Sequence, residues 1–215
     1  MLSLMMDRPL LVGSLLNHAE QFHPHQQVVS RLGDGTLARY SYAQLAQRTR
    51  QLGNALLAMG VKPGDRVGTL AWNTHRHLEL YYACAGIGAI CHTINPRLHV
   101  DQLSYIIDHG EDILLFFDID MAPLAQTLSA SRAVSMQWVA LGTEEDLARE
   151  ELTGYVAYET LLAEHSDELE WPDVDERDAC SLCYTSGTTG NPKGVLYSHR
   201  STVLHAMVAS LPDCA

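Results

Sequence analysis

Apolar residues along this chain alternate between helical spacing and short continuous runs, and this alternation predicts its elements. Helices are predicted at 10–22, 41–60, 74–88, 100–109, 122–131 and 198–211. Short apolar runs predict strands at 28–32, 37–40, 66–72, 89–94, 113–117, 137–141, 179–184 and 194–197. Strands separated by helices of this length indicate β-α-β units, so we expect an α/β fold with a largely parallel sheet flanked by helices.

Turn and capping residues mark the ends of several of these elements. Gly33, Asp34 and Gly35 predict a hairpin between the first two strands. Ser41 is a suitable N-cap, and Gln44 stands three residues later, as in a capping box. An Asn-Pro pair at 95–96 is most simply a turn before a helix.

Charge is concentrated in one part of the chain. The formal net charge is −12, and more than half of the 26 acidic residues lie between positions 144 and 178. We expect this stretch to be a solvated surface connection with one helix at 158–164. An acidic chain repels a phosphate backbone, so nucleic acid is not expected as a partner.

The apolar and cysteine patterns bear on where the protein resides. The longest apolar stretch, 80–91, contains two glycines and is too short to span a bilayer, and residues 1–8 do not resemble a signal peptide. The five cysteines are odd in number and irregularly spaced, which argues against a disulfide framework. We therefore expect a cytoplasmic protein without a transmembrane segment.

The run at 184–194, Tyr-Thr-Ser-Gly-Thr-Thr-Gly-Asn-Pro-Lys-Gly, has the composition of a polyphosphate-binding loop. Glycine allows backbone N–H groups to approach an anion closely and to form a nest around it. The hydroxyl groups add donors and can reach a phosphate-bound magnesium ion, and Lys193 adds a positive charge. A flexible Ser/Gly linker is the alternative, but a linker has no need to lie between two strands and to end in Pro-Lys-Gly.

Three better-known motifs do not match. The loop is not a Walker A sequence, because Lys193 follows Pro192 and precedes Gly194. A dinucleotide-binding G-x-G-x-x-G fails because Cys91 stands where its third glycine is required. No G-x-S-x-G hydrolase motif occurs.

The loop resembles the signature loop of the adenylate-forming, AMP-binding superfamily. Other segments resemble its fatty acyl-CoA synthetase branch, among them GDRV at 64–67, HTINPRL at 92–98 and YSHR at 197–200. The resemblance implies an acid–thiol ligase that activates a medium- or long-chain fatty acid with ATP and Mg²⁺ and transfers the acyl group to coenzyme A. It further implies that the phosphate contacts are Thr185, Ser186, Gly187, Thr188, Thr189, Gly190 and Lys193, with Thr185 also near the magnesium ion.

The chain is shorter than members of that superfamily, and the resemblance implies that it corresponds to their N-terminal part. On this basis 1–25 is a helical segment, 26–178 an α/β subdomain, and 179–215 the phosphate loop with its following helix. The adenine-binding segment, the acidic magnesium ligand, the ribose-binding Asp and the C-terminal domain with its catalytic Lys are missing. We therefore assign no catalytic residue and expect these 215 residues alone to be inactive.

Several alternatives stay open. The carboxylate could be an aryl or amino acid, or the chain could be a non-catalytic fragment that only binds or dimerises. The N-terminal segment could be a packing helix or a homodimer contact.

Cys180 and Cys183 fit a packed core strand better than a metal site. The histidine pairs at 23/25 and 75/77 are interpreted as surface or helix-end residues, and His199 could pack beneath the phosphate site without a catalytic role.

Overall fold

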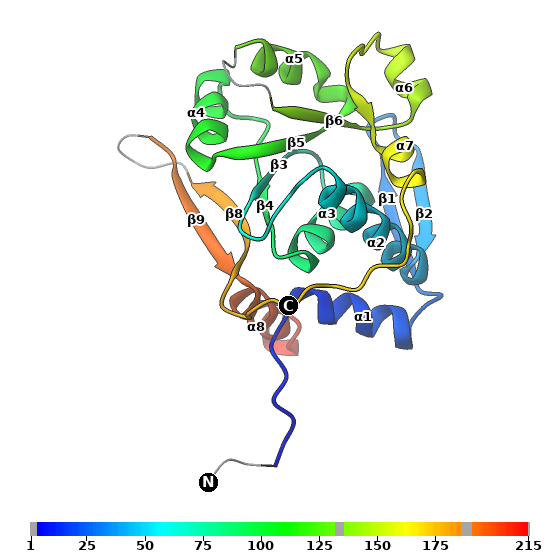
Figure 1. The fold of residues 1–215 in the computed structure, drawn as a ribbon, viewed down its shortest axis with the longest axis vertical. Coiled ribbons are helices and arrows are strands. Elements are labelled where there is room, and N and C mark those ends of the chain that lie inside the picture. Colours follow the sequence, from blue (N-terminus) through cyan, green and yellow to red (C-terminus); the bar gives the residue numbers. More distant parts are fainter. Residues whose placement is uncertain (1–3, 132–135, 186–190, 215) are drawn as a thin grey trace.

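The computed structural model describes residues 4–131, 136–185 and 191–214. Within these ranges, the main sheet has seven strands in the order β7-β6-β5-β3-β4-β8-β9. Neighbouring strands are parallel except for β8 and β9, which form an antiparallel pair. Helices cover both faces of this sheet (Figure 1). The predicted α/β fold with a largely parallel sheet is confirmed.

The element boundaries follow the sequence pattern closely. The strands are β1 (Gln27–Arg31), β2 (Leu37–Ser41), β3 (Arg66–Leu70), β4 (Ile90–Thr93), β5 (Asp112–Asp118), β6 (Gln137–Leu141), β7 (Val156–Ala157), β8 (Ala179–Thr185) and β9 (Lys193–Ser198). The α-helices are α1 (Val12–Phe22), α2 (Tyr42–Ala58), α3 (His75–Gly86), α4 (Val100–Gly110), α5 (Ala122–Ala130), α6 (Glu144–Arg149), α7 (Tyr158–Ala163) and α8 (His199–Ala209). Short 3₁₀ turns occupy Ile119–Met121 and Pro212–Cys214.

Hydrophobic residues on the two faces of the central strands build two separate cores. In β5, Leu114 and Phe116 join a cluster with α2, α3 and α7, whereas Leu115 and Phe117 join a cluster with α4 and α5. Successive side chains of a strand point to opposite faces, so an uninterrupted apolar run serves both cores. This explains why the parallel strands read as continuous apolar segments in the sequence.

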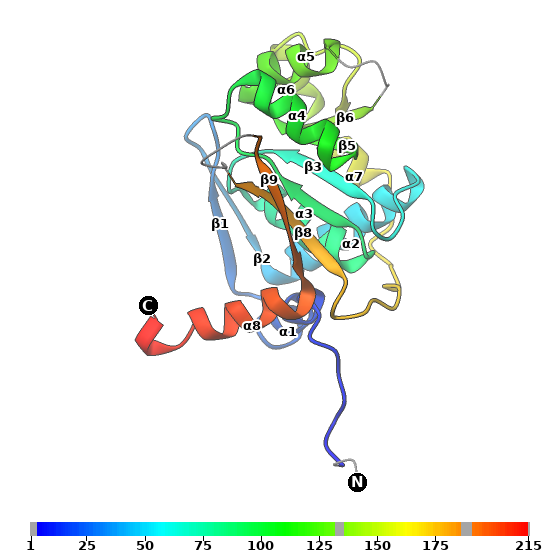
Figure 2. The same ribbon diagram turned by 90° about the vertical axis from the view of Figure 1, so that its left-hand side faces the viewer.

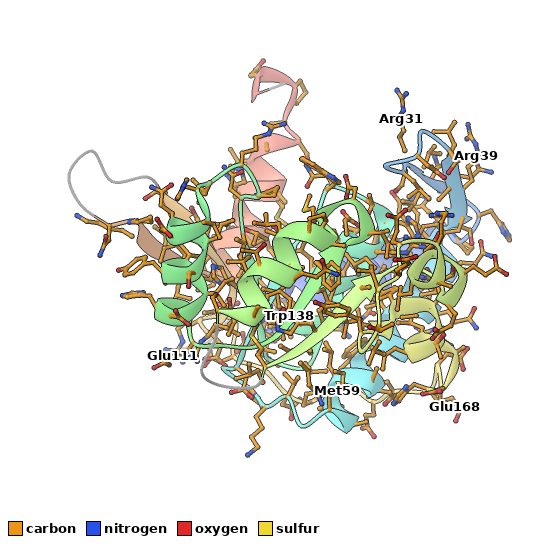
Figure 3. The ribbon with its side chains drawn as sticks, turned by 90° about the horizontal axis from the view of Figure 1, so that it is seen from above. Arg31, Arg39, Met59, Glu111, Trp138 and Glu168 are labelled. Atoms are coloured by element: carbon orange, nitrogen blue, oxygen red, sulfur yellow. The ribbon has the colours of Figure 1, made fainter. Side chains whose placement is uncertain are left out.

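The hairpin of β1 and β2 lies apart from the main sheet. Its strands pair in antiparallel register from Gln27–Ser41 to Arg31–Leu37. Arg31 and Arg39 reach outward from it (Figure 3). Ser41 then begins α2 with a capping box, because its hydroxyl accepts from the Gln44 N–H and the Gln44 side chain accepts from the Ser41 N–H. The hairpin and capping predictions are both confirmed.

The acidic stretch differs in part from the expected solvated connection. It contains an additional helix, α6, which Thr143 begins with a capping box to Asp146. After α7, the segment 164–178 is tied to α2, because Arg50 donates to the Asp167 carbonyl (2.8 Å) and Asn54 donates to the Ser166 carbonyl (2.7 Å). The helix expected at 158–164 is present as α7, and residues 164–178 are exposed or half-buried, as expected of a surface connection. Helix α6 and the contacts with α2 were not predicted, and the α2 residues lie more than a hundred positions earlier in the chain.

The N-terminal segment and α8 lie side by side at one end of the molecule (Figure 2). The Leu10 N–H donates to Glu176 (2.7 Å), and the Val12 N–H donates to Nδ1 of His199 (3.3 Å). His199 is buried, and its burial lowers its pKa. Ser198 pairs with Ala179 at the start of β8, whereas the phosphate loop follows Thr185 at the end of β8. His199 therefore does not lie beneath the phosphate site, and our expectation was wrong.

Candidate functional site

The β8–β9 hairpin fixes both ends of the proposed phosphate loop. Thr185, the last residue of β8, is the cross-strand partner of Lys193, the first residue of β9. Two candidate residues eight positions apart in sequence are therefore opposite each other at the edge of the sheet. The remaining candidates, Ser186, Gly187, Thr188, Thr189 and Gly190, lie outside the described residues.

Both described candidates carry side chains that are available to a ligand. Thr185 and Lys193 are exposed, and among the described residues Lys193 has no carboxylate partner at ion-pair distance. An uncompensated ammonium group beside a hydroxyl suits a polyphosphate, which needs a positive charge and hydrogen-bond donors. The donor set at the base of the loop therefore fits the expected phosphate ligand.

A cavity of about 440 Å³ adjoins the start of the loop. Its wall includes Cys183 and Tyr184, the two residues that precede Thr185 in β8. The volume falls in the range of roughly 300–1,000 Å³ that is typical of small-molecule sites. Its other lining residues lie on or just after β3 and β4 and on the helices that follow these strands: Ala71, Trp72, Asn73, His77, Tyr81, Thr93, Ile94, Asn95, Pro96, Arg97, Leu98 and Ile106.

The topology explains why the cavity forms here. β4 follows β3 on one side of that strand, and β5 returns to pair on the other side. The intervening helices also separate, because α3 packs in one hydrophobic core and α4 in the other. The loops that leave the carboxyl ends of β3 and β4 therefore diverge, and in open parallel sheets such a point is the usual ligand crevice.

A second cavity of about 350 Å³ shares Trp72 with the first and is lined by Asp118 at the end of β5. The Trp72 N–H donates to Asp118 (2.6 Å), and the indole N–H donates to Asp120 (2.8 Å). Burial raises the pKa of Asp118 to about 6, although the hydrogen bond from Trp72 opposes that shift. This carboxyl group is therefore partly protonated near pH 6.

The cysteine and histidine predictions agree with the structure. Cys180 is buried in β8, and Cys183 is half-buried with its Sγ 2.9 Å from the Thr93 hydroxyl, so both belong to a packed strand. His23 and His25 are exposed, and His75 and His77 lie at the start of α3, so the expectation of surface or helix-end residues holds, although His75 and His77 are buried there. Burial lowers the pKa of His75 to about 4.

Two further properties of the described residues concern metals and membranes. Within the described ranges, no group of three or more His, Cys, Asp or Glu side chains is arranged as metal ligands would be. No helix in the described part of the chain is both long and apolar enough to cross a membrane.

Several residues around the cavities do not stand out in the sequence. The pattern predicts a strand at Trp72 and a simple turn at Asn95, and it singles out neither Arg97 nor Asp118. Trp72, Asn95 and Arg97 lie in the first few residues after a parallel strand, and Asp118 is the last residue of one. Their common place at the carboxyl ends of parallel strands was a signal that could have identified them.

Comparison with known proteins finds similarity to CoA ligases over nearly the whole chain. The family described as "AMP-binding enzyme" matches residues 16–214. The 3-methylmercaptopropionyl-CoA ligase of Ruegeria lacuscaerulensis is 47% identical over 99% of this chain and 40% of its own length. The medium-chain-fatty-acid–CoA ligase of Ectopseudomonas oleovorans is 46% identical over 99% of this chain and 39% of its own length. The chain thus spans about 40% of the length of these relatives.

Solved structures agree on the fold. The anthranilate CoA ligase AuaEII in complex with anthranoyl-AMP matches 94% of this chain and 37% of its own length, with a TM-score of 0.80 at 24% identity. A fatty acyl CoA synthetase of Mycobacterium tuberculosis matches 88% of this chain and 35% of its own length, with a TM-score of 0.70 at 24% identity. These likenesses support the arrangement of the sheet and helices.

Proposed function

Since this chain belongs to the AMP-binding enzyme family, we propose that it carries the polyphosphate-holding part of an acyl-CoA ligase site. The observation that carries the proposal is the pairing of Thr185 with Lys193 at the two ends of the glycine- and hydroxyl-rich loop. The reaction proposed for the whole site forms an acyl-adenylate from a carboxylate and ATP and then transfers the acyl group to the thiol of coenzyme A.

Residues of the loop have distinct roles in this proposal. Lys193 provides a fixed positive charge against the terminal phosphates, and Thr185 orients its hydroxyl toward them and toward magnesium. Ser186, Gly187, Thr188, Thr189 and Gly190 supply hydroxyl and backbone donors between these two ends. Bound magnesium, in turn, neutralises part of the phosphate charge so that attack on the α-phosphate becomes favourable.

The cavity beside Tyr184 is the proposed place where substrates other than the triphosphate approach the loop. It lies at the carboxyl ends of β3, β4 and β8, and it combines apolar wall residues with the polar groups of Asn95 and Arg97. Such a mixture suits a ligand that is partly apolar and partly polar. Catalytic groups are not assigned, because the proposal concerns holding and orienting the phosphates.

Aliphatic carboxylates are the proposed substrate class. The relatives at 44–47% identity include ligases named for medium-chain fatty acids, long-chain fatty acids and 3-methylmercaptopropionate. The last of these is named for a short, sulfur-containing acyl group, so the names do not point to one chain length. An aryl carboxylate is the second candidate, because a protein of the same fold is an anthranilate CoA ligase.

The organisation of the whole protein is also proposed. Residues 26–178 and 179–215 belong to one large domain, and 1–25 is a helical segment that is a candidate homodimer contact.

We propose a cytoplasmic location and no nucleic-acid partner. The net charge of −12 supports the second of these, because an acidic chain repels a phosphate backbone.

The test is carboxylate-dependent exchange of labelled pyrophosphate into ATP, in a protein that carries this segment at the full length of its relatives. We expect exchange with octanoate and with 3-methylmercaptopropionate, and weaker exchange with anthranilate. Exchange with anthranilate alone would replace the aliphatic proposal by the aryl one, and no exchange with any carboxylate would contradict the adenylation reaction. The 215-residue chain alone is expected to form no acyl-CoA, and acyl-CoA formation by it would contradict that expectation.

A further inference from the structure

Tyr184 makes a tight contact with the residue opposite it at the base of the phosphate loop. Tyr184 and Gly194 are cross-strand partners, one pair further from the loop than Thr185 and Lys193. A Cβ atom at position 194 would lie 3.1 Å from Cζ of the Tyr184 ring and 3.2 Å from Cδ1 of Leu182. The ring therefore lies directly over the Gly194 backbone. Any residue other than glycine at position 194 would place its side chain in the space that the ring occupies.

The hydroxyl end of Tyr184 is joined to a different element. Its oxygen lies 2.6 Å from Nδ1 of His109, in the last turn of α4. The pKa of Tyr184 is raised, first by partial burial and then by the nearby Asp112 carboxylate, so the phenol stays protonated at neutral pH. The Tyr184 side chain thus spans from β9 to α4 across the face of the sheet.

The Tyr184 ring also packs against His92, a buried side chain that pairs with Asp112. The centroid of the His92 ring lies 5.2 Å from that of Tyr184. Nδ1 of His92 lies 2.8 Å from both carboxylate oxygens of Asp112, and both side chains are fully buried. A Cβ at Gly110 would lie 3.1 Å from the His92 ring, so α4 also packs closely against this pair. The surface beneath Tyr184 is therefore held from β4, β5 and α4.

We propose that Tyr184 is a positioning residue for Thr185 and Lys193, the two ends of the phosphate loop. It is adjacent to Thr185 in sequence, and its partner Gly194 is adjacent to Lys193, so its contacts set the spacing and direction of both ends of the loop. This inference rests on the proposed function of the loop. Donors that are ordered before the ligand arrives lose less conformational freedom on binding, which strengthens the complex.

A tyrosine that only fills space would give different results from one that positions the loop. Replacing a space-filling side chain lowers stability but leaves the intrinsic affinity of a folded loop unchanged. Replacing a positioning side chain lowers the affinity of the folded protein. Gly194→Ala separates the two further, because the Tyr184 ring is the nearest group that its methyl would meet (3.1 Å). Once the ring is removed, the remaining close group is the end of the Leu182 side chain (3.2 Å), which can shift.

The experiment measures binding of magnesium pyrophosphate to the 215-residue chain by calorimetry. We expect Tyr184→Ala and Gly194→Ala each to weaken binding about tenfold, and Tyr184→Phe, which keeps the ring, to weaken it only about threefold. The double variant Tyr184→Ala/Gly194→Ala should bind as tightly as Tyr184→Ala alone. Tyr197→Ala is the matched control, because Tyr197 is an exposed tyrosine at the other end of β9, and its affinity should equal that of the wild type.

A second measurement separates failure of this inference from failure of the proposed function. Amide hydrogen exchange of β8 and β9 next to the loop needs no ligand, and we expect it to be faster in Tyr184→Ala than in Tyr197→Ala. If the wild type binds no magnesium pyrophosphate, the phosphate role of the loop is contradicted, while exchange that is faster only next to the loop, and not in the rest of the chain, still shows that Tyr184 orders the ends of the loop. Equal exchange in the two variants, or losses of affinity that simply add in the double variant, would overturn the positioning role.

Discussion

The guanidinium group of Arg48 on α2 holds the fully buried carboxylate of Glu79 on α3, with its Nε 2.7 Å from Oε1 of Glu79. The same guanidinium donates to Glu159 on α7 (2.9 Å), which also accepts from Arg76 (2.8 Å). The Tyr158 hydroxyl donates to the other oxygen of Glu79 (2.6 Å). These bonds join the three helices that cover one face of the sheet.

Removing Arg48 should therefore destabilise the protein strongly. In Arg48→Ala, Glu79 would stay buried without its cationic partner, and loss of one partner of a buried ion pair costs about 3–5 kcal/mol. The measurement is the free energy of unfolding from urea titration. Arg177→Ala is the control, because Arg177 pairs with Asp175 on the exposed surface, where the loss should be close to zero. Equal unfolding midpoints for the two variants would contradict this view of the helix layer.

Asp118 should make the protein less stable as the pH rises from about 4 to about 6. Burial raises the pKa of Asp118 from 3.8 to about 6 in the folded state, against the opposing hydrogen bond from Trp72. Over that interval the folded state holds a proton that the unfolded state has lost, so the free energy of unfolding falls as pH rises. A shift of this size corresponds to about 3 kcal/mol at neutral pH.

The variant that tests this effect is Asp118→Asn, which does not titrate but keeps a carbonyl oxygen to accept from the Trp72 N–H. We expect its stability relative to the wild type to increase between pH 4 and pH 7, as measured by urea unfolding at several pH values. Comparison at each pH cancels the opposite effect of His75, whose burial lowers its pKa to about 4. A difference that does not change with pH would show that Asp118 does not titrate as described.

The fold was largely predictable because local signals and the two-sided core agree. The apolar run at 113–117 predicts a strand by itself, and β5 buries its residues from 114 to 117 alternately against two helical layers, whereas Ile113 is exposed. By contrast, α6 has few apolar residues and depends on the capping box of Thr143, which was overlooked. The tethering of 164–178 to α2 could not be inferred, because it depends on contacts between residues far apart in sequence.

The site was predictable only in part, for a related physical reason. The loop has a distinctive composition, so Thr185 and Lys193 were identified from their sequence context, and the structure adds that they face each other. The neighbouring cavity is formed by the loops that follow β3 and β4, at the point where β4 lies on one side of β3 and the next strand, β5, lies on the other. Strand order is not encoded in any single segment, so residues such as Trp72 and Arg97 did not stand out.

Gly86 on α3 should be required for the segment 164–178 to pack against α2 and α3. A Cβ at Gly86 would overlap the Trp171 ring, and a Cβ at Gly53 on α2 would lie 3.0 Å from the same ring. Gly86→Ala should therefore cost about 1–3 kcal/mol of stability and expose Trp171, which fluorescence would report. Gly13→Ala on α1 is the control, because a Cβ there meets nothing within 4 Å, and we expect no loss or a gain of up to about 1 kcal/mol. The same effect from both variants would contradict the steric argument.

Lys193 should contribute to magnesium ATP binding in a way that the chain's other lysine does not. The sequence contains just two lysines, Lys62 in the turn before β3 and Lys193 at the end of the phosphate loop. Lys193→Ala should weaken magnesium ATP binding to the 215-residue chain by roughly ten- to a hundredfold, the usual range for a hydrogen bond to a charged group. Lys62→Ala removes the same charge from the molecule at a distant site and should leave the affinity close to that of the wild type. Because the effect is electrostatic, the ratio between the two variants should shrink as salt is added. Equal affinities of the two variants at low salt would contradict the role of Lys193, since net charge alone would then explain binding.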